Sequence, residues 1–144
     1  MPSLTILGLL MAFDWPLRVY IEDTDFGGIV YYVNYLKFME RARTEMLRQF
    51  GYSQHRLAAE HCLFVVHSVD CRYLKPARLD DELIVRSAIE EAGAASLIFN
   101  QKIIDRHTEQ TLCEGRVRVA CVNGQTFRPI RWPRELVMAL ATPD

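Results

Sequence analysis

Residues 22–35 combine acidic side chains, a glycine pair and the aromatic start of a helix. Asp23 and Asp25 lie in the expected turn, and Gly27 and Gly28 follow them. The first N–H groups of a helix have no partner within the helix and carry partial positive charge, so they can stabilise an oxyanion. A carboxylate beside such donors is suited to attack an activated carbonyl group. The stretch therefore indicates a site for attack on a carbonyl group.

Asp25 is the candidate catalytic residue of this stretch. Its carboxylate can attack a carbonyl as a nucleophile, or it can activate a water molecule as a general base. Taken alone, the pattern favours a simpler role, because an aspartate before glycine often hydrogen-bonds within its own turn. Gly27 and Gly28 permit close backbone approach to a ligand, or they only form the turn. We expect Asp23 to be structural.

Metal binding fits this sequence poorly. A calcium loop that begins at Asp23 would lack an oxygen ligand at Gly27, and Asn34 would stand where a bidentate glutamate belongs. The four histidines do not have the spacing of zinc ligands. We expect His67, which lies in an apolar strand, to be in the core. The sequence therefore predicts neither a metal nor another cofactor.

The composition indicates one domain with a well-buried core. The chain has 144 residues, of which 50% are hydrophobic. Its net charge is −1 and it has no dense basic stripe, which argues against nucleic-acid binding. The four cysteines form no C-x-x-C pair, and we expect them to be small buried thiols and not disulfides.

The N-terminal residues 1–13 are apolar, but they do not have the features of an export signal. They lack a basic start and an evident cleavage site, and they are too short to span a membrane. We therefore expect no membrane insertion and a cytoplasmic location.

The hydrophobic pattern predicts a strand, a long helix and then several strands. Apolar residues alternate with polar ones over residues 17–22, which is typical of a half-buried strand. From Tyr35 to Phe50 they recur at three- and four-residue spacing, which predicts a helix that Asn34 can cap and Gly51 can close. Further strands are expected over residues 63–73, 83–89, 97–104 and 113–122, and a short helix after Trp132-Pro133.

This order of elements is typical of an α+β protein in which an antiparallel sheet packs on a helix. One face of the sheet covers the apolar stripe of the helix. The other face and the edges remain partly apolar unless subunits associate. The pattern by itself predicts a sheet packed on a helix and no finer topology.

Two segments carry a resemblance to a known family. Residues 23–43 read DTDFGGIVYYVNYLKFMERAR, and this segment resembles the signature of hot-dog-fold acyl-CoA thioesterases. The resemblance is greatest to the Tol–Pal-associated type within the 4-hydroxybenzoyl-CoA thioesterase family. Residues 73–83, YLKPARLDDEL, are similar to a segment that these proteins carry after their first long strand.

The resemblance covers approximately residues 17–140 and implies a hot-dog fold, in which a curved antiparallel sheet wraps around one long helix. We accordingly expect a single domain over residues 17–144 and a disordered N-terminal extension over residues 1–16. Members of the family form homodimers that often pair into homotetramers.

The resemblance also implies roles for individual residues. The catalytic aspartate of the family aligns with Asp25, and the helix-start amide that polarises the thioester carbonyl aligns with the backbone amide of Tyr32. Tol–Pal-type members usually carry histidine at the position of Tyr32, so a mechanism that uses this histidine is not expected here. The backbone N–H does not depend on the side chain, so its role as a donor is still expected. The expected substrate-binding residues are Gly28, Ile29, Tyr31 and Asn34.

The implied activity is hydrolysis of acyl-CoA thioesters to free acid and coenzyme A. Enzymes for 4-hydroxybenzoyl-CoA carry a basic cluster near residues 93–95, and its absence here favours short aliphatic acyl chains. Candidates for contacts with the coenzyme A phosphates are Arg72, Lys75, Lys102, Arg106, Arg116 and Arg118. Two alternatives stay open: a non-catalytic acyl-binding or scaffolding subunit at the cell envelope, and an aromatic thioesterase of the 4-hydroxybenzoyl-CoA type.

Overall fold

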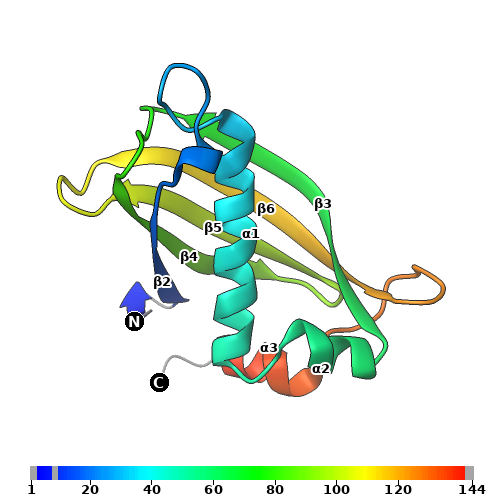
Figure 1. The fold of residues 1–144 in the computed structure, drawn as a ribbon. Helices are drawn as coiled ribbons and strands as arrows, with labels where there is room; N and C mark the ends of the chain where they lie inside the picture. Colours follow the sequence, from blue (N-terminus) through cyan, green and yellow to red (C-terminus); the bar gives the residue numbers. More distant parts are fainter. Residues whose placement is uncertain (1–2, 8–9, 142–144) are drawn as a thin grey trace.

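A curved antiparallel sheet wraps around one long helix in the computed structural model of the chain, which describes residues 3–7 and 10–141 (Figure 1). The strand order in the sheet is β1-β2-β4-β5-β6-β3. The strands are β1 (Ser3–Leu7), β2 (Leu10–Arg18), β3 (Cys62–Tyr73), β4 (Glu82–Ala92), β5 (Ser96–Asp105) and β6 (Thr111–Asn123). The helices are the 3-10 turn η1 (Ile21–Asp23), α1 (Tyr32–Gln49), α2 (Gln54–Ala59) and α3 (Arg134–Ala141). The predicted α+β arrangement is confirmed.

Helix α1 lies across the concave face of the sheet and buries the predicted apolar stripe (Figure 1). Gly51 ends the helix as expected, because its φ of +86° lies in the left-handed region and its N–H donates to the Arg48 carbonyl over 2.9 Å. The predicted cap by Asn34 is wrong. The helix already begins at Tyr32, with Tyr31 at the N-cap and no side-chain cap, so Asn34 lies inside the first turn.

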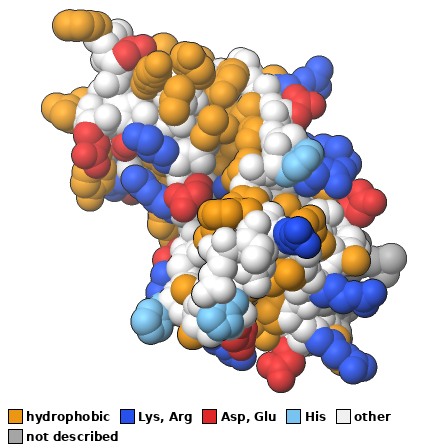
Figure 2. Space-filling view, turned by 90° about the vertical axis from the view of Figure 1, so that its right-hand side faces the viewer, with side chains coloured by type: hydrophobic (Ala, Val, Ile, Leu, Met, Phe, Trp, Pro, Cys, Tyr) orange, Lys and Arg blue, Asp and Glu red, His pale blue; other side chains and the backbone are white. Residues whose placement is uncertain are grey.

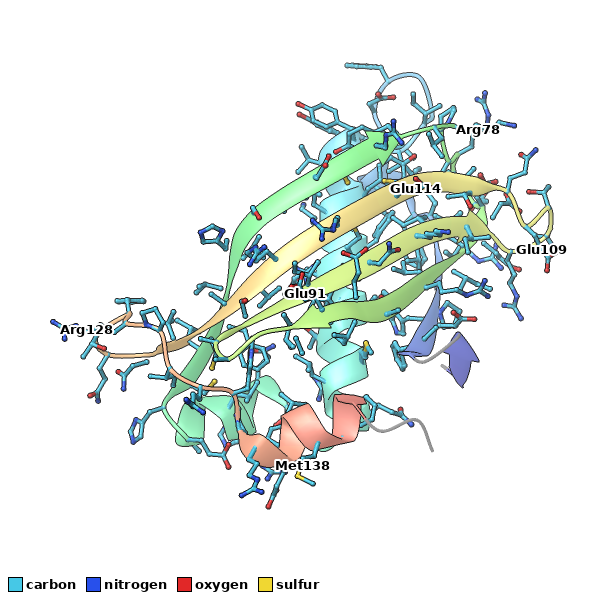
Figure 3. All side chains as sticks on the ribbon, turned by 180° about the vertical axis from the view of Figure 1, so that it is seen from behind. Arg78, Glu91, Glu109, Glu114, Arg128 and Met138 are labelled. Carbon is cyan, nitrogen blue, oxygen red and sulfur yellow. The ribbon has the colours of Figure 1, made fainter. Side chains whose placement is uncertain are left out.

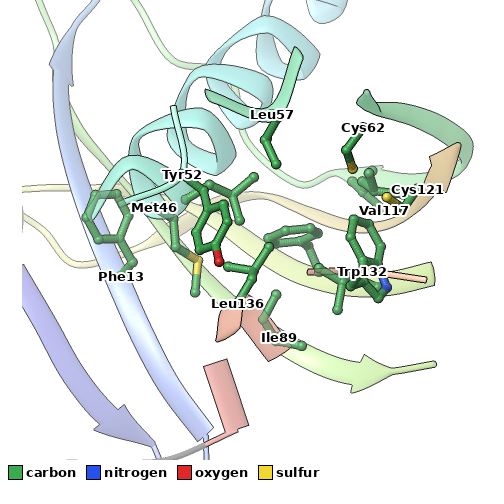
Figure 4. Packing of buried hydrophobic residues seen from close by; sticks show 14 residues of the cluster. Phe13, Met46, Tyr52, Leu57, Cys62, Ile89, Val117, Cys121, Trp132 and Leu136 are labelled. Atoms are coloured by element: carbon green, nitrogen blue, oxygen red, sulfur yellow. The ribbon is translucent and has the colours of Figure 1, made fainter. Parts of the chain in front are cut away.

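Two hydrophobic clusters fill the space between helix and sheet. The cluster at the carboxyl end of α1 is closed by α2 and α3, and it includes Met46, Phe99 and Leu136 (Figure 4). Within it, the Trp132 ring meets Phe64 edge to face at 4.5 Å. The second cluster surrounds the amino-terminal half of α1 and holds the start of the helix against β2, β4 and β5.

The N-terminal boundary of the domain needs correction. Instead of a disordered extension over residues 1–16, the sheet already includes Leu10–Arg18 as β2, which pairs with β4. Phe13 is fully buried, and Asp14 pairs with Arg86 across the two strands at 2.8 Å. The alternating pattern begins only at Leu17, so it missed residues 10–16 of this strand, which are more uniformly apolar. The strand predicted over residues 17–22 is wrong beyond Arg18, because residues 21–23 form the turn η1. Residues 1–2 and 8–9 lie outside the described residues.

Strand β3 lies at the edge of the sheet and exposes much of its surface. Figure 2 views the β3 side of the molecule and shows hydrophobic side chains gathered there. Those exposed on and just after β3 are Leu63, Val66, Val69, Tyr73 and Leu74. The prediction that His67 lies in the core is wrong, because His67 is exposed where the strand bulges between Val66 and Ser68.

A buried polar network connects α1 with the middle of the sheet. The Gln101 side chain has no exposed surface; its amide donates to the Met39 carbonyl and to the Ser87 hydroxyl over 2.9 and 2.8 Å. Its carbonyl oxygen accepts a hydrogen bond from Arg43 over 2.9 Å. Burial lowers the pKa of Arg43, which has no ion-pair partner within the described part of the chain. The Gln101 carbonyl therefore stabilises a buried cation.

Gly115 permits α1 to lie close to β6. A Cβ atom at this position would stand 2.7 Å from both the sulfur and the terminal carbon of Met39, which is fully buried. We expect Gly115→Ala to lower the free energy of unfolding by about 1–3 kcal/mol, because Met39 must move within a packed core. Urea denaturation measures this change.

Gly124→Ala is the matched control, because nothing lies within 4 Å of a Cβ atom there. Its effect should stay within about 0.5 kcal/mol. Equal effects of the two substitutions would contradict the close packing of Met39 on Gly115.

No helix in the described ranges, 3–7 and 10–141, combines the length and the apolar character that crossing a bilayer requires.

Candidate active site

Asp23 fastens the loop before α1 to the first turn of that helix. Its carboxylate is buried and accepts hydrogen bonds from the Tyr20 N–H and from the Asn34 side chain, each over 2.9 Å. Its carbonyl oxygen accepts from the Tyr31 N–H over 2.9 Å. The structural role expected for Asp23 is confirmed, and the Asn34 amide has a partner within the protein.

Asp25 heads a tight turn and remains exposed. One carboxylate oxygen accepts a hydrogen bond from the Gly27 N–H over 2.8 Å, and the Asp25 carbonyl accepts from Gly28 over 3.1 Å. Gly28 has a φ of +76°, so the turn requires glycine at this position. The other carboxylate oxygen has no hydrogen-bond partner among the described residues. One oxygen of Asp25 therefore shapes the turn while the other is open to a ligand.

The start of α1 presents an unused hydrogen-bond donor. The N–H groups of Tyr31 and Asn34 are paired, with the carbonyls of Asp23 and Tyr31 respectively. The N–H of Tyr32 has no partner in the part of the chain that the structure describes. Because this N–H lies at the positive end of an 18-residue helix, it can stabilise negative charge on a ligand.

An aromatic groove of about 310 Å³ lies beside the Tyr32 side chain. The Tyr73 ring approaches the Tyr32 and Tyr35 rings, with centroids 5.9 and 5.7 Å away. Burial, followed by the neighbouring Cys71, raises the pKa of Tyr73 to about 12, and burial raises the pKa of Tyr35. Both phenols are therefore uncharged at neutral pH. The groove is lined by Ile29, Val30, Tyr32, Tyr35, Tyr73, Leu74, Lys75 and Pro76.

The two segments that carry the family resemblance meet at this groove. The Val30 N–H donates to the Ala77 carbonyl over 2.8 Å, and Ile29 forms a β-bridge with Arg78. The Tyr35 hydroxyl accepts a hydrogen bond from the Ala77 N–H over 2.9 Å. Residues 74–78 therefore support the loop that leads from Asp25 to α1.

The structure brings some of the predicted site residues together and separates others. Ile29 and Tyr32 line the groove, while Tyr31 stacks on the Tyr32 ring with centroids 4.9 Å apart. Gly28 belongs to the turn, and the Asn34 side chain is held by Asp23.

Sequence reasoning did not assign Tyr73, Leu74 and Pro76 to the site. They follow a strand that the hydrophobic pattern predicts, but nothing in that pattern places the end of this strand beside the start of α1.

Most of the basic residues considered for coenzyme A contacts lie away from the groove. A shallow depression of about 360 Å³ contains Arg72, Lys102 and Arg116 together with Asp70 and Glu114. It lies on the outer, polar face of the sheet, which Figure 3 shows from behind α1. Arg116 is further paired with a neighbouring glutamate. Lys75, by contrast, lines the groove itself.

The Asp23–Asn34 contact allows a test of loop anchoring. We expect Asn34→Ala to lower the free energy of unfolding by about 1–3 kcal/mol, because one buried oxygen of Asp23 loses its donor. Thermal and urea denaturation measure the loss. Lys37→Ala, at an exposed position of the same helix, is the control and should change stability by less than about 0.5 kcal/mol. If both variants are equally stable, Asp23 does not hold the loop through Asn34.

Comparison with known proteins decides the family. Residues 19–140 match the thioesterase-like superfamily. The chain belongs to this family. It is 46% identical over 126 residues to the acyl-CoA thioester hydrolase YbgC of Escherichia coli O157:H7, covering 87% of this chain and 92% of that protein. It is 42% identical over 129 residues to the acyl-CoA thioesterase YbgC of Haemophilus influenzae, covering 89% and 93%.

Solved structures agree with this placement in the thioesterase-like superfamily. A probable thioesterase from Bartonella henselae matches with a TM-score of 0.79 and 34% identity, over 83% of this chain and 98% of that chain. The predicted hot-dog fold is therefore confirmed, and so is the expectation of a thioester-hydrolysing enzyme.

Proposed function

We propose that the protein hydrolyses acyl-CoA thioesters, with short acyl chains preferred, to a carboxylic acid and coenzyme A. The observation that carries this proposal is that two groups without a hydrogen-bond partner in the described structure lie at the two ends of one short loop. They are one carboxylate oxygen of Asp25 and the N–H of Tyr32. The names of the Escherichia coli and Haemophilus influenzae relatives support the acyl-CoA substrate.

In the proposed reaction, the Tyr32 N–H donates a hydrogen bond to the thioester carbonyl and stabilises the negative charge that develops on its oxygen. Asp25 then acts in one of two ways. Its carboxylate attacks the carbonyl carbon, which expels the coenzyme A thiolate and leaves a mixed anhydride that water hydrolyses. Alternatively, it takes a proton from water as the water attacks the same carbon. Both routes yield the acid and the free thiol.

The groove beside Tyr32 is the proposed site for the acyl group. Its tyrosine rings and the Ile29 side chain offer apolar contact, and Lys75 supplies a positive charge close to the groove for a phosphate of the coenzyme. We assign Tyr31 to substrate binding through its exposed ring, which stacks on Tyr32. Gly28 and Asn34 support substrate binding indirectly, because Gly28 forms the turn after Asp25 and Asn34 anchors the loop to Asp23.

We further propose that two copies associate through the exposed edge strand β3, as a dimer or as a dimer of dimers. An edge strand with unpaired backbone groups and exposed apolar side chains is a template for pairing with another strand. The resemblance of residues 23–43 to Tol–Pal-associated thioesterases supports a cytoplasmic enzyme that associates with an envelope complex.

A thiol-release assay over a series of aliphatic and aromatic acyl-CoA substrates tests the proposed function. We expect the highest kcat/KM for short aliphatic chains. Binding of acyl-CoA without release of thiol would contradict hydrolysis and would favour the acyl-binding subunit. The four clustered tyrosines make an aromatic acyl group the second candidate, and a preference for benzoyl-type substrates would establish it.

A further inference from the structure

Arg43 is a buried cation beside a cavity that lies between α1 and β3. The residue is 9% exposed, and its one hydrogen bond to a described residue goes to the neutral side-chain carbonyl of Gln101 over 2.9 Å. A guanidinium group has five N–H donors, so most of those on Arg43 have no partner in the described ranges. A buried charge without an opposite charge beside it is costly. This arrangement favours an anion that reaches Arg43 through the cavity.

The cavity borders the edge strand of the sheet. Its volume is about 130 Å³, and the charged side chains that line it are Glu40 and Arg43 of α1. Strand β3 contributes Phe64 and Val66, and Val66 is 49% exposed. The cavity therefore adjoins the strand through which we propose that two copies associate.

Glu40 is a candidate for the missing anion. It precedes Arg43 by three residues, so both side chains lie on one side of the helix. Glu40 is exposed and forms no ion pair with any residue that the structure describes. Burial lowers the pKa of Arg43 and the charge of Glu40 raises it, but the two groups do not pair within one chain. The lining of the cavity thus presents one cation without an anion and one anion without a cation.

Pairing of two identical edge strands in antiparallel orientation generates a twofold axis beside β3. In such an interface the same surface of both copies is used, so this surface must be complementary to itself. Because the cavity adjoins β3, it faces the corresponding cavity of the second copy. A surface that carries one unpaired charge of each sign meets this requirement.

We propose that Arg43 forms an ion pair with Glu40 of a second copy of the chain, and that a second, reciprocal pair forms across the twofold axis. The two pairs neutralise the buried cations and fix the register in which the two β3 strands associate. This inference rests on the association through β3 proposed above and does not depend on the acyl-CoA substrate.

The first test is the dissociation constant of the dimer, measured by sedimentation velocity over a dilution series of the full-length protein. Glu40→Gln should raise this constant at least about tenfold, because each dimer loses both pairs and keeps two buried cations. Glu45→Gln is the matched control. Glu45 lies on the same helix, pairs with Arg48 at the surface and does not line the cavity. Its neutralisation should change the constant by less than about twofold.

A mixture of Glu40→Gln and Arg43→Met chains distinguishes pairs between copies from pairs within one copy. In the mixed dimer, Arg43 of one chain still meets Glu40 of the other, and the reciprocal contact has lost both charges. We expect the mixed dimer to have a dissociation constant at least about tenfold lower than that of either variant homodimer. Its share should therefore exceed the half that random pairing gives. Native mass spectrometry of chains with tags of two lengths measures this share.

Random pairing in the mixture, or equal dissociation constants for Glu40→Gln and Glu45→Gln, would overturn the proposal and would assign the anion to the same chain or to the solution. A protein that stays monomeric at every concentration would overturn the association through β3 as well. Because Glu40 is exposed, Glu40→Gln should fold, and its comparison with Glu45→Gln tests the proposal without the Arg43 variant. Thiol release from acyl-CoA tests the proposed activity separately.

Discussion

Asp25→Asn should lower kcat for a short-chain acyl-CoA by about 10²–10⁴-fold while the fold remains intact. An amide oxygen can still accept the hydrogen bond from the Gly27 N–H, so the turn is retained. The neutral amide can neither attack the carbonyl nor accept a proton from water, and this is the contribution expected of a positioned base or nucleophile. Thiol release at saturating substrate measures the loss, and a thermal melt checks the fold.

Glu22→Gln is the matched control for Asp25→Asn. Glu22 is an exposed carboxylate in the same loop, so its neutralisation changes the local charge without removing the proposed catalytic group. We expect its kcat to stay close to that of the parent. Full activity in the Asp25 variant, or an equal loss in the Glu22 variant, would contradict the proposed role of Asp25.

Gln101→Leu should produce the largest loss of stability, about 3–5 kcal/mol. The substitution removes the acceptor of the buried Arg43 guanidinium and the donor to the Met39 carbonyl, and it leaves both groups in an environment with little water. Urea denaturation measures the difference. Asn100→Ala, at the adjacent exposed position of β5, should change stability by less than about 0.5 kcal/mol.

A double variant separates the network from simple packing. In Arg43→Met/Gln101→Leu the buried charge is absent. Gln101→Leu should therefore lower the free energy of unfolding of the Arg43→Met variant by at least about 1–2 kcal/mol less than it does in the parent. Additive losses would mean that the Arg43–Gln101 hydrogen bond contributes little and that the cost reflects the shape of the core.

The sequence predicted the elements whose patterns are local. The apolar stripe of α1 and its end at Gly51 follow from spacing and from one glycine, and both are confirmed. Most of strand β2 was missed because apolar and polar residues do not alternate over residues 10–16 and because a proline within a strand is unusual. In the structure, Pro16 nevertheless lies in register with β4. The burial of Arg43 could have been predicted, because this residue lies four positions after Met39 and therefore on the apolar stripe of the helix.

The candidate site was predictable only in part, for a physical reason. Asp25 and the start of α1 lie in one short segment, so their order in the chain implies their proximity. Tyr73 and Lys75 reach the groove through the pairing of β3 with β6 and through the return of residues 74–78 along the loop. Such contacts depend on strand register and tertiary packing, which a hydrophobic pattern does not encode.

The most direct measurement is a crystal structure of the protein with a non-hydrolysable acyl-CoA analogue in which a methylene group replaces the thioester sulfur. We expect the carbonyl oxygen about 3 Å from the Tyr32 nitrogen, and a carboxylate oxygen of Asp25 about 3–3.5 Å from the carbonyl carbon or joined to it by one water. A carbonyl bound away from Tyr32, with Asp25 contacting neither the analogue nor a water beside it, would contradict the proposed site.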